Sequence, residues 1–577
     1  MASKSNTVVV LKFGSSVLRS ENDLPRAVHE IYRWWREGAK VIAVVSAFGD
    51  TTNRLARLAE NICSQPEKST VASLLATGET TSSALLGLAL NNVGIPARVL
   101  DAAQVGLRTV GARLDADPVE LDSARLWGET CRGVVVLPGF VGRGENGDTT
   151  LLGRGGSDYS ALFLAQRLKA HCVLLKDVDG LYTSDPSCTA VRASRFERVS
   201  YDSAIRLGGS VVQQKAVRFA AAHRLTFTIT SIGARTGTEV GPFPDRLDPA
   251  RYTQEPLRVI LLGCGTVGGG VYQRLAALPE LFTVVGVGAR TASRATEAGV
   301  PDHLFTSDLE TLIEKPCDVV VELIGDTKRA AFLIERALHL GRNLVTANKT
   351  LIAHAGDELH TLAAETGATL CYSSAVGGVL PALETIKRVR EVSPLRAISG
   401  VLNGTTNFIL DQLAIGQSFG VAVKAAQERG YAEQDPQFDL DGIDAAQKLI
   451  ILVAAAFDQH LALHAITRNG IRDLNAEALK AAQERGQAIR LVARCVRSDH
   501  GLEASVQPVE LPLNHPFAQI KGAQNCLLVE PEVGERVVVS GEGAGRWPTT
   551  ESVIADLFEI RSNHQEEEMK ELEECVA

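Results

Sequence analysis

Three glycines, Gly263, Gly265 and Gly268, follow one apolar run and precede a helical pattern. Residues 257–262 predict the strand and residues 271–278 the helix, which is the context that a dinucleotide-binding loop requires. Such glycines allow a tight turn and a close approach of the backbone to a pyrophosphate, which the helix N-terminus then stabilises. The residues predicted to contact a dinucleotide here are Gly263, Gly265, Thr266, Val267 and Gly268.

The next predicted strand, residues 282–289, ends at Arg290. An acidic residue at this position would bind the adenosine ribose of NAD, whereas an arginine can pair with a 2′-phosphate. NADP is therefore the favoured cofactor. NAD remains the alternative, since Arg290 could simply be a strand-end side chain that extends into water.

Two charged residues further on have helical spacing. Asp444 and Lys448 stand four residues apart, so on a helix they share one face. The apolar run that follows, residues 449–457, indicates a buried helix. On position alone, a surface ion pair is the commoner arrangement for such a pair.

The composition is that of a globular protein with more than one domain. A chain of 577 residues is too long for one hydrophobic core, and 45% hydrophobic and 22% charged residues argue against disorder. The net charge of −9 favours neither nucleic acid nor a membrane surface as a partner. No apolar run approaches the roughly 20 residues that span a bilayer. Ten cysteines without a Cys-x-x-Cys pair indicate reduced thiols of a cytoplasmic protein.

The first 240 residues alternate apolar strands with helices, which predicts an α/β sandwich with a largely parallel sheet. A break follows at residues 241–255, where three prolines interrupt any regular pattern, and a second βαβ unit begins at Leu257. The acidic segment 566–575 predicts a solvated helix or a frayed tail. The predicted strands are residues 8–13, 40–46, 133–140 and 172–176, and the predicted helices are residues 24–37 and 159–168.

The second half resembles homoserine dehydrogenase. Residues 318–325, 345–349, 402–407, 430–436, 439–448 and 541–545 follow the order of that family's motifs. The resemblance implies an enzyme that reduces aspartate semialdehyde to homoserine with a nicotinamide cofactor. It also makes Asp444 and Lys448 active-site residues, Lys448 stabilising or protonating the developing alkoxide and Asp444 orienting it.

The same resemblance implies further roles. Lys349 would lie near the nicotinamide and the reacting carbon, and Glu433 would bind the substrate ammonium. The pocket would be lined by Gly404, Thr405 and Tyr431, with backbone contacts to the cofactor from Ile324 and Gly430. A loop resembling the family's structural sodium site has a serine in place of the usual glutamate, but carbonyls do not depend on the side chain. The implied sodium ligands are Ser373, Val376, Gly378 and Leu380.

The first half resembles an aspartokinase of the amino-acid kinase fold. Residues 12–17, 44–53, 77–79, 152–158 and 176–186 follow the family's order. Phosphoryl transfer to a carboxylate needs cations and backbone amides around the moving group. Lys12 would supply charge and Asp158 would organise the phosphate site, with ATP and Mg²⁺ as co-substrate. Glu79, Arg154 and Ser46 would hold aspartate, and Lys176, Asp177, Asp179 and Tyr182 the nucleotide.

Two departures from the kinase pattern leave alternatives open. The loop after Lys12 is one residue shorter and lacks a glycine, and residues 209–215 lack the family's lysine and His-Pro, for which Lys215 could substitute. The first half is therefore an aspartate kinase, a non-catalytic scaffold or sensor, or a kinase of another acid such as glutamate. The kinase pattern stops near Val240, so no ACT regulatory domain fits before Leu257.

The resemblances together predict the architecture. An amino-acid kinase fold, a three-layer α/β/α sandwich, is followed by a Rossmann domain and an α+β catalytic domain. We expect only small-molecule partners, namely aspartate, aspartate semialdehyde and homoserine, and a homo-oligomer joined through the dehydrogenase half. The predicted domains are residues 1–241, 256–390 and 391–563, with an acidic tail at 564–577.

Overall fold

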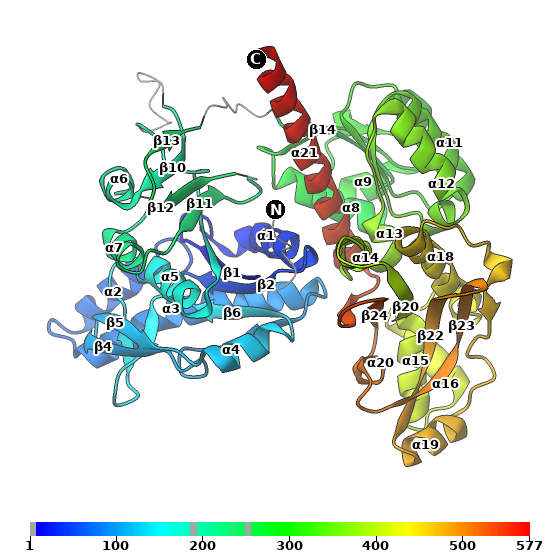
Figure 1. Cartoon of the computed structure of the whole chain (residues 1–577), viewed down its shortest axis with the longest axis horizontal. Coiled ribbons are helices and arrows are strands. Elements are labelled where there is room, and N and C mark those ends of the chain that lie inside the picture. The colour runs from blue at the N-terminus through cyan, green and yellow to red at the C-terminus, as the bar shows by residue number, and fades with distance from the viewer. Residues whose placement is uncertain (1–6, 185–192, 210, 235, 249–254, 577) are drawn as a thin grey trace. The chain divides into compact units, whose positions relative to one another are not determined.

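The computed structural model describes residues 7–184, 193–209, 211–234, 236–248 and 255–576, with the backbone alone for 565–576 (Figure 1). Asp185 and Pro186, which end the predicted nucleotide segment, lie outside the described residues. The chain divides into two compact units, Met1–Thr253 and Gln254–Ala577.

The first unit is built on a nine-stranded sheet in the order β13-β10-β12-β11-β9-β1-β2-β6-β3. Its central neighbours β1, β2, β6 and β9 pair in parallel, and β1 is buried along its whole length. Helices α1, α3 and α5 pack against these strands. The predicted parallel α/β sandwich is confirmed. The bounds are β1 Val8–Phe13, β2 Lys40–Val45, β3 Ala97–Val99, β6 Val134–Pro138, β9 His171–Lys176, β10 Phe196–Ser200, β11 Phe227–Ser231, β12 Thr238–Gly241, β13 Arg246–Leu247, α1 Leu24–Arg36, α3 Lys68–Asn92 and α5 Gly156–Leu168.

Two parts of this unit differ from the prediction. The strand β13 lies inside the predicted break and pairs antiparallel with β10 at the sheet edge. A second sheet of four strands, β5-β4-β7-β8, was not predicted, because its strands are short and half exposed and carry no apolar run. These strands are β4 Arg108–Ala112, β5 Asp115–Glu120, β7 Val141–Arg143 and β8 Thr149–Leu151.

The second unit begins with a parallel six-stranded sheet in the order β16-β15-β14-β17-β18-β19. This is the predicted Rossmann arrangement, with the glycine loop between β14 and α8. The helix starts at Thr266, earlier than predicted, because the glycines at 268–270 are themselves helical and buried. The bounds are β14 Leu257–Leu262, β15 Phe282–Gly288, β16 Phe305–Thr306, β17 Val319–Glu322, β18 Asn343–Thr346, β19 Leu370–Cys371, α8 Thr266–Ala276, α11 Thr327–His339 and α12 Lys349–Thr366.

A second six-stranded sheet, β21-β23-β22-β20-β24-β25, follows and is antiparallel apart from the β21–β23 pair. Helix α18 packs on β20 and β22, so its buried face and the sheet share one core. The bounds are β20 Leu395–Val401, β21 Thr467–Arg468, β22 Gln487–Ser498, β23 Gly501–Pro512, β24 Gln524–Pro531, β25 Val537–Glu542, α15 Gly404–Ala414 and α18 Ile443–Phe457.

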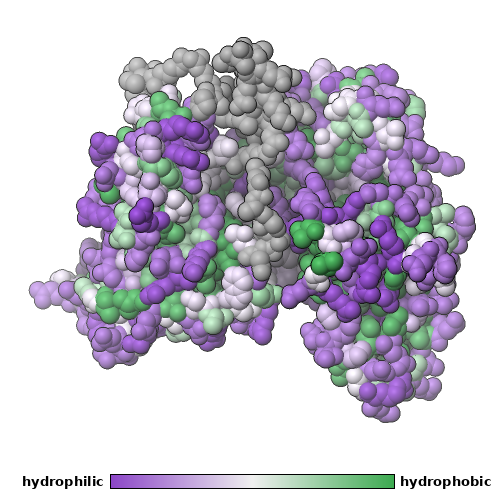
Figure 2. All heavy atoms as spheres, viewed as in Figure 1, coloured by the Kyte–Doolittle hydropathy of each residue, from purple (hydrophilic) through white to green (hydrophobic). Residues whose placement is uncertain are grey.

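The last helix, α21 (Arg546–Val576), returns to the Rossmann sheet. Val553, Ile554 and Leu557 share a buried cluster with Val259 and Leu261 of β14. The C-terminal end of this unit thus supplies one wall of the Rossmann core. On the face shown in Figure 2, hydrophilic residues predominate and hydrophobic ones form small groups. No helix in the described part of the chain is long and apolar enough to cross a bilayer.

Candidate active sites

One carboxylate in the second unit holds two lysines. Lys349 donates to Oδ1 of Asp444, and the Lys448 ammonium lies 3.1 Å from Oδ2. Lys448 also donates to the carbonyl of Leu402 at 2.8 Å. An ammonium has three donors, so these two contacts leave Lys448 one N–H for a substrate oxygen.

Three elements of the fold bring these groups together. Lys349 is the first residue of α12, which Asn348 caps by accepting from a backbone N–H. Asp444 stands in the first turn of α18, after Gly442 turns the chain with a φ of 72°. Asn403, which caps α15, donates to Oδ2 of Asp444 at 2.8 Å. The N-terminal ends of α12 and α18 and the segment between β20 and α15 therefore meet at the Asp444 carboxylate.

The charges stabilise one another. Burial alone would raise the pKa of Asp444, but Lys448 and Lys349 hold it well below its ordinary value. Burial alone would lower the pKa of Lys349, and the Asp444 carboxylate raises it overall. Asp439 has a raised pKa because of its burial and the nearby Asp444 charge. Asp444 is consequently an anion and Lys349 a cation near neutral pH.

The four residues expected to bind the substrate or line its pocket come from two segments. The hydroxyl of Thr405 joins the segments by donating to the carbonyl of Tyr431 at 2.6 Å. Glu433 is exposed, and its charge contributes to the raised pKa of Lys349. An exposed carboxylate is thus near Lys349, where it can meet a ligand from solvent. The four residues are Gly404 and Thr405 at the start of α15, and Tyr431 and Glu433 after α16 (Phe419–Glu428); Gly430, expected to contact the cofactor, directly precedes Tyr431.

The glycine loop has the close contacts that a dinucleotide site needs. A Cβ on Gly263 would lie 2.4 Å from the carbonyl oxygen of Leu323, and a Cβ on Gly268 would lie 2.0 Å from that of Gly263. Gly265, in contrast, has only Nη1 of Arg294 nearby, at 3.7 Å from its Cβ position. Gly263 and Gly268 therefore allow the tight turn, where a side chain would clash with backbone. Gly265, with Thr266 and Val267, leaves space at the N-terminus of α8 for a pyrophosphate.

Arg290 lies just beyond β15, exposed, and it forms no ion pair with the described residues. A guanidinium at this strand end fits a phosphate ligand. Ile324, on the other side of the glycine loop, is half-buried after β17. The protein groups present therefore fit a nicotinamide dinucleotide.

Of the four residues expected to bind sodium, Ser373 and Val376 lie in α13 (Ser373–Gly377), and Gly378 and Leu380 follow it. Val376, Gly378 and Leu380 are buried, and Gly378 has a φ of 50°, which favours glycine. The N–H of Ser373 donates to Oδ2 of Asp556 on α21 at 3.1 Å. Carbonyl oxygens are suitable ligands for a hard cation, so the loop is compatible with one.

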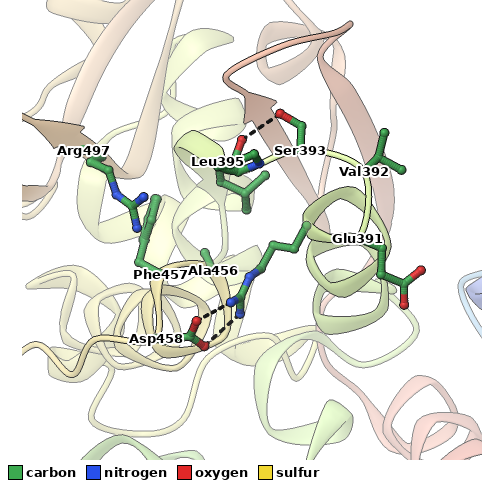
Figure 3. Close-up of a pocket in the computed structure, with 10 residues that line it drawn as sticks. Glu391, Val392, Ser393, Leu395, Ala456, Phe457, Asp458 and Arg497 are labelled. Carbon is green, nitrogen blue, oxygen red and sulfur yellow. Dashed lines mark hydrogen bonds and ion pairs between the residues drawn. The ribbon is translucent and has the colours of Figure 1, made fainter.

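A cavity of about 330 Å³ lies elsewhere in this unit, at the C-terminal end of α18 (Figure 3). Arg390 donates to Oδ1 of Asp458 at 2.9 Å there. Arg497 lies over the ring of Phe457. Asp458 follows Asp444 by 14 residues, or roughly 20 Å along a helix. The cavity is therefore separate from the two lysines.

In the first unit, a buried carboxylate again holds two lysines. Lys12 Nζ lies 2.7 Å from Oδ1 of Asp158, and Lys176 Nζ lies 2.9 Å from Oδ2. Burial would raise the pKa of Asp158, but the two ammonium groups lower it to about 2. Burial lowers the pKa of Lys176 to about 8. Cations from the ends of β1 and β9 thus meet at the start of α5.

Glu79 on α3 lies nearby and has no cation bonded to it among the described residues. Its carboxyl is buried, with Oε1 3.5 Å from the hydroxyl of Ser157 and Oε2 without a hydrogen bond. Burial raises the pKa of Glu79 to about 8. Ser46, at the end of β2, is also buried. An unsatisfied buried carboxyl is an acceptor ready for a cationic ligand.

The other kinase residues are less closely assembled. Arg154 and Asp177 are exposed, and Arg154 forms no hydrogen bond or ion pair within the described ranges. The Tyr182 hydroxyl donates to Oδ1 of Asp179 at 2.6 Å. Lys215 lies 2.7 Å from Asp115 and also bonds the Leu152 carbonyl at 3.2 Å. Lys215 thus bonds the four-stranded sheet instead of Asp158.

Known proteins match both units. Residues 381–558 match the family model of homoserine dehydrogenase, and residues 263–373 match the model of its NAD binding domain. The chain is 34% identical over 316 residues to the homoserine dehydrogenase of Synechocystis sp., a match that covers 53% of this chain and 73% of that protein. This chain belongs to the homoserine dehydrogenase family.

Other homoserine dehydrogenases are similar to this chain to about the same degree. The Pseudomonas aeruginosa protein is 34% identical over 316 residues, which cover 53% of this chain and 72% of that protein. The crystal structure of a homoserine dehydrogenase from Thiobacillus denitrificans has a TM-score of 0.52 and 34% identity, and covers 54% of this chain and 74% of that one. Residues 7–231 match the amino acid kinase family. The expected domain order of a bifunctional aspartokinase/homoserine dehydrogenase is confirmed.

Two residues around these sites, Asn403 and Arg195, were not singled out from the sequence. Asn403 donates to both Asp439 and Asp444, so it joins two carboxylates of the homoserine dehydrogenase half. Arg195 bonds both Asp179 and Asp248 in the kinase half. Both residues are at least 16 positions from their partners in the sequence. The motif containing Asn403 was recognised, but spacing alone does not reveal such contacts.

Proposed function

We propose that this chain is a bifunctional enzyme of the aspartate pathway. The second unit reduces L-aspartate 4-semialdehyde to L-homoserine with NADPH, and the first unit phosphorylates L-aspartate with ATP to 4-phospho-L-aspartate. The observation that carries the dehydrogenase proposal is the Asp444 carboxylate, which fixes Lys349 and Lys448 beside the glycine-loop domain.

In the dehydrogenase half, Lys448 donates its remaining N–H to the carbonyl oxygen and stabilises the alkoxide as it forms. Asp444 orients Lys448, and Lys349 lies by the reacting carbon. Glu433 holds the substrate ammonium, while Tyr431, Gly404 and Thr405 line the pocket. The bound nicotinamide cofactor supplies the hydride.

The cofactor proposed is NADP. The guanidinium of Arg290 is exposed and forms no ion pair with the described residues, which supports a 2′-phosphate ligand. Gly263, Gly265 and Gly268 support a pyrophosphate at the start of α8. Gly430 and Ile324 contact the cofactor through their backbone. The loop of Ser373, Val376, Gly378 and Leu380 would hold a structural sodium ion through carbonyl oxygens.

In the kinase half, Lys12 and Lys176 surround the phosphoryl group with positive charge and Asp158 holds both in place. Glu79 accepts a hydrogen bond from the ammonium of the substrate aspartate. Exposed Arg154 pairs with a carboxylate of the same aspartate, and Ser46 lies beside them. Asp177, Asp179 and Tyr182 bind the nucleotide, which arrives with Mg²⁺.

A second candidate is a homoserine dehydrogenase with a non-catalytic kinase-like domain. The observation that favours it concerns Lys215, the residue that could replace the family's missing lysine. Lys215 bonds Asp115 and the carbonyl of Leu152, so it does not take the place of that lysine. The test measures homoserine-dependent NADP reduction and aspartyl hydroxamate formation from ATP on one preparation, with glutamate as the matched alternative acid. Both activities with aspartate support the bifunctional enzyme, and oxidation of homoserine alone supports the second candidate.

We also propose the domain limits 1–241, 256–390 and 391–563, with a tail at 564–577. The enzyme would act in the cytoplasm on small molecules, as a homo-oligomer joined through the dehydrogenase half.

A further inference from the structure

A fully buried carboxyl group, that of Glu322, stands at the end of β17 in the Rossmann sheet. Its described partners are one backbone N–H and one hydroxyl. Burial raises the pKa of Glu322 to about 7, although both hydrogen bonds act to lower it. A buried carboxylate without a cation destabilises a fold, so its presence at this position needs a functional reason.

On one side, Glu322 holds the backbone beneath the cofactor loop. Its Oε1 accepts from the N–H of Ile324 at 2.5 Å. The neighbouring Leu323 carbonyl is the group that a Cβ on Gly263 would strike, at 2.4 Å, and Ile324 N would lie 3.3 Å away. The glycine loop therefore rests on backbone that the Glu322 carboxyl fixes.

On the other side, Glu322 connects to the start of α12. Its Oε2 accepts from the Thr346 hydroxyl at 2.6 Å, and that hydroxyl oxygen accepts from the N–H of Asn348 at 3.0 Å. Asn348 caps α12 by accepting from Leu351 N–H at 3.2 Å. The first residue of that helix, Lys349, reaches Asp444.

We propose that Glu322 is a positioning residue that sets the distance between the cofactor loop and the Lys349 ammonium. The inference rests on the proposed dehydrogenase function, since it concerns how far the nicotinamide lies from the reacting carbon. One continuous hydrogen-bonded path joins the Ile324 backbone to the Asn348 cap, and each group along it is half-buried or buried. A misplaced reacting group lowers turnover steeply even when both ligands still bind.

The path predicts different effects for its two ends. Glu322→Gln weakens the bonds on both sides, so we expect cofactor affinity and kcat each to fall about tenfold or more. Thr346→Val is isosteric and breaks only the side toward Lys349, so kcat should fall while the KM for the cofactor stays near the wild-type value. Thr346→Ser, which keeps the hydroxyl, should restore kcat. Glu314→Gln, at an exposed carboxylate on the same domain, is the control and should change neither constant.

The experiment measures kcat and KM for homoserine and NADP, NADPH affinity by calorimetry, and thermal unfolding for all four variants. Lower unfolding temperatures with wild-type kcat and cofactor affinity would overturn the proposal, because that is the behaviour of a purely structural carboxyl. If Glu322→Gln does not fold, the kcat of Thr346→Val against Thr346→Ser decides. If the wild type does not oxidise homoserine, the proposed function fails, and the NADPH affinity of Glu322→Gln still tests whether this carboxyl supports the cofactor loop.

Discussion

The Lys448 ammonium lies 3.1 Å from Oδ2 of Asp444, and both side chains are buried at the start of α18. The same carboxylate binds Lys349 through Oδ1. The two ammonium groups hold the pKa of Asp444 below its ordinary value against the effect of burial, so the carboxylate stays charged across the neutral range. Charges fixed in this way need no reorganisation when an alkoxide forms.

The glycine loop gives a paired prediction. Gly265→Ala should fold normally, because its Cβ position is open except for Arg294 at 3.7 Å, yet it should weaken cofactor binding by filling the space for a pyrophosphate. Gly268→Ala should lower the unfolding temperature, because its Cβ would lie 2.0 Å from a carbonyl oxygen. Calorimetric titration with NADPH and thermal unfolding check both. Unchanged NADPH affinity in Gly265→Ala would contradict the placement of the cofactor.

Cofactor choice is tested at Arg290. Arg290→Ala should lose a charged hydrogen bond of about 1.5–3 kcal/mol, which is on the order of 10- to 100-fold in NADP affinity. NAD affinity should barely change. Arg336→Ala, at an exposed arginine of α11 paired with Glu314, is the control. Equal weakening of both cofactors would mean that Arg290 is structural.

Much of the fold could be predicted because buried parallel strands are long apolar runs, as β1 and β14 are. The strands β4 and β5 of the small sheet were not predicted, because they are short and partly exposed and carry no apolar run. Lys12 and Asp158 were identified separately from resemblance, but their 2.7 Å contact depends on tertiary packing. The role proposed for Glu322 could not be predicted, since a carboxylate within an apolar strand has no local signature.

Glu79 gives a pH prediction. Burial raises its pKa to about 8, so near neutral pH the free enzyme carries a proton there. An aspartate ammonium favours the carboxylate, so binding should release about one proton below that pKa and none well above it. Calorimetric titration of L-aspartate in buffers of different ionisation enthalpy measures the proton, and Glu79→Gln should abolish the release. A binding heat independent of buffer would refute the role of Glu79.

The kinase proposal predicts separable sites. Lys12→Ala and Asp158→Asn should each lower aspartyl hydroxamate formation at least about 100-fold, because the charges around the phosphoryl group act together. Homoserine oxidation should be unchanged in both. Lys68→Ala, at an exposed lysine that begins α3, is the matched control. Equal hydroxamate formation by all variants would assign the activity to another site.

Turnover of homoserine by Lys448→Ala tests the central claim most directly. Loss of the one ammonium that faces the alkoxide should lower kcat on the order of 100- to 1,000-fold, while NADP affinity stays close to wild type. The unfolding temperature should fall, because buried Asp444 keeps only one of its two cations. Lys480→Ala, at an exposed lysine of α19 (Ala476–Glu484), should behave as wild type. A folded Lys448→Ala enzyme with near-normal kcat would contradict the account.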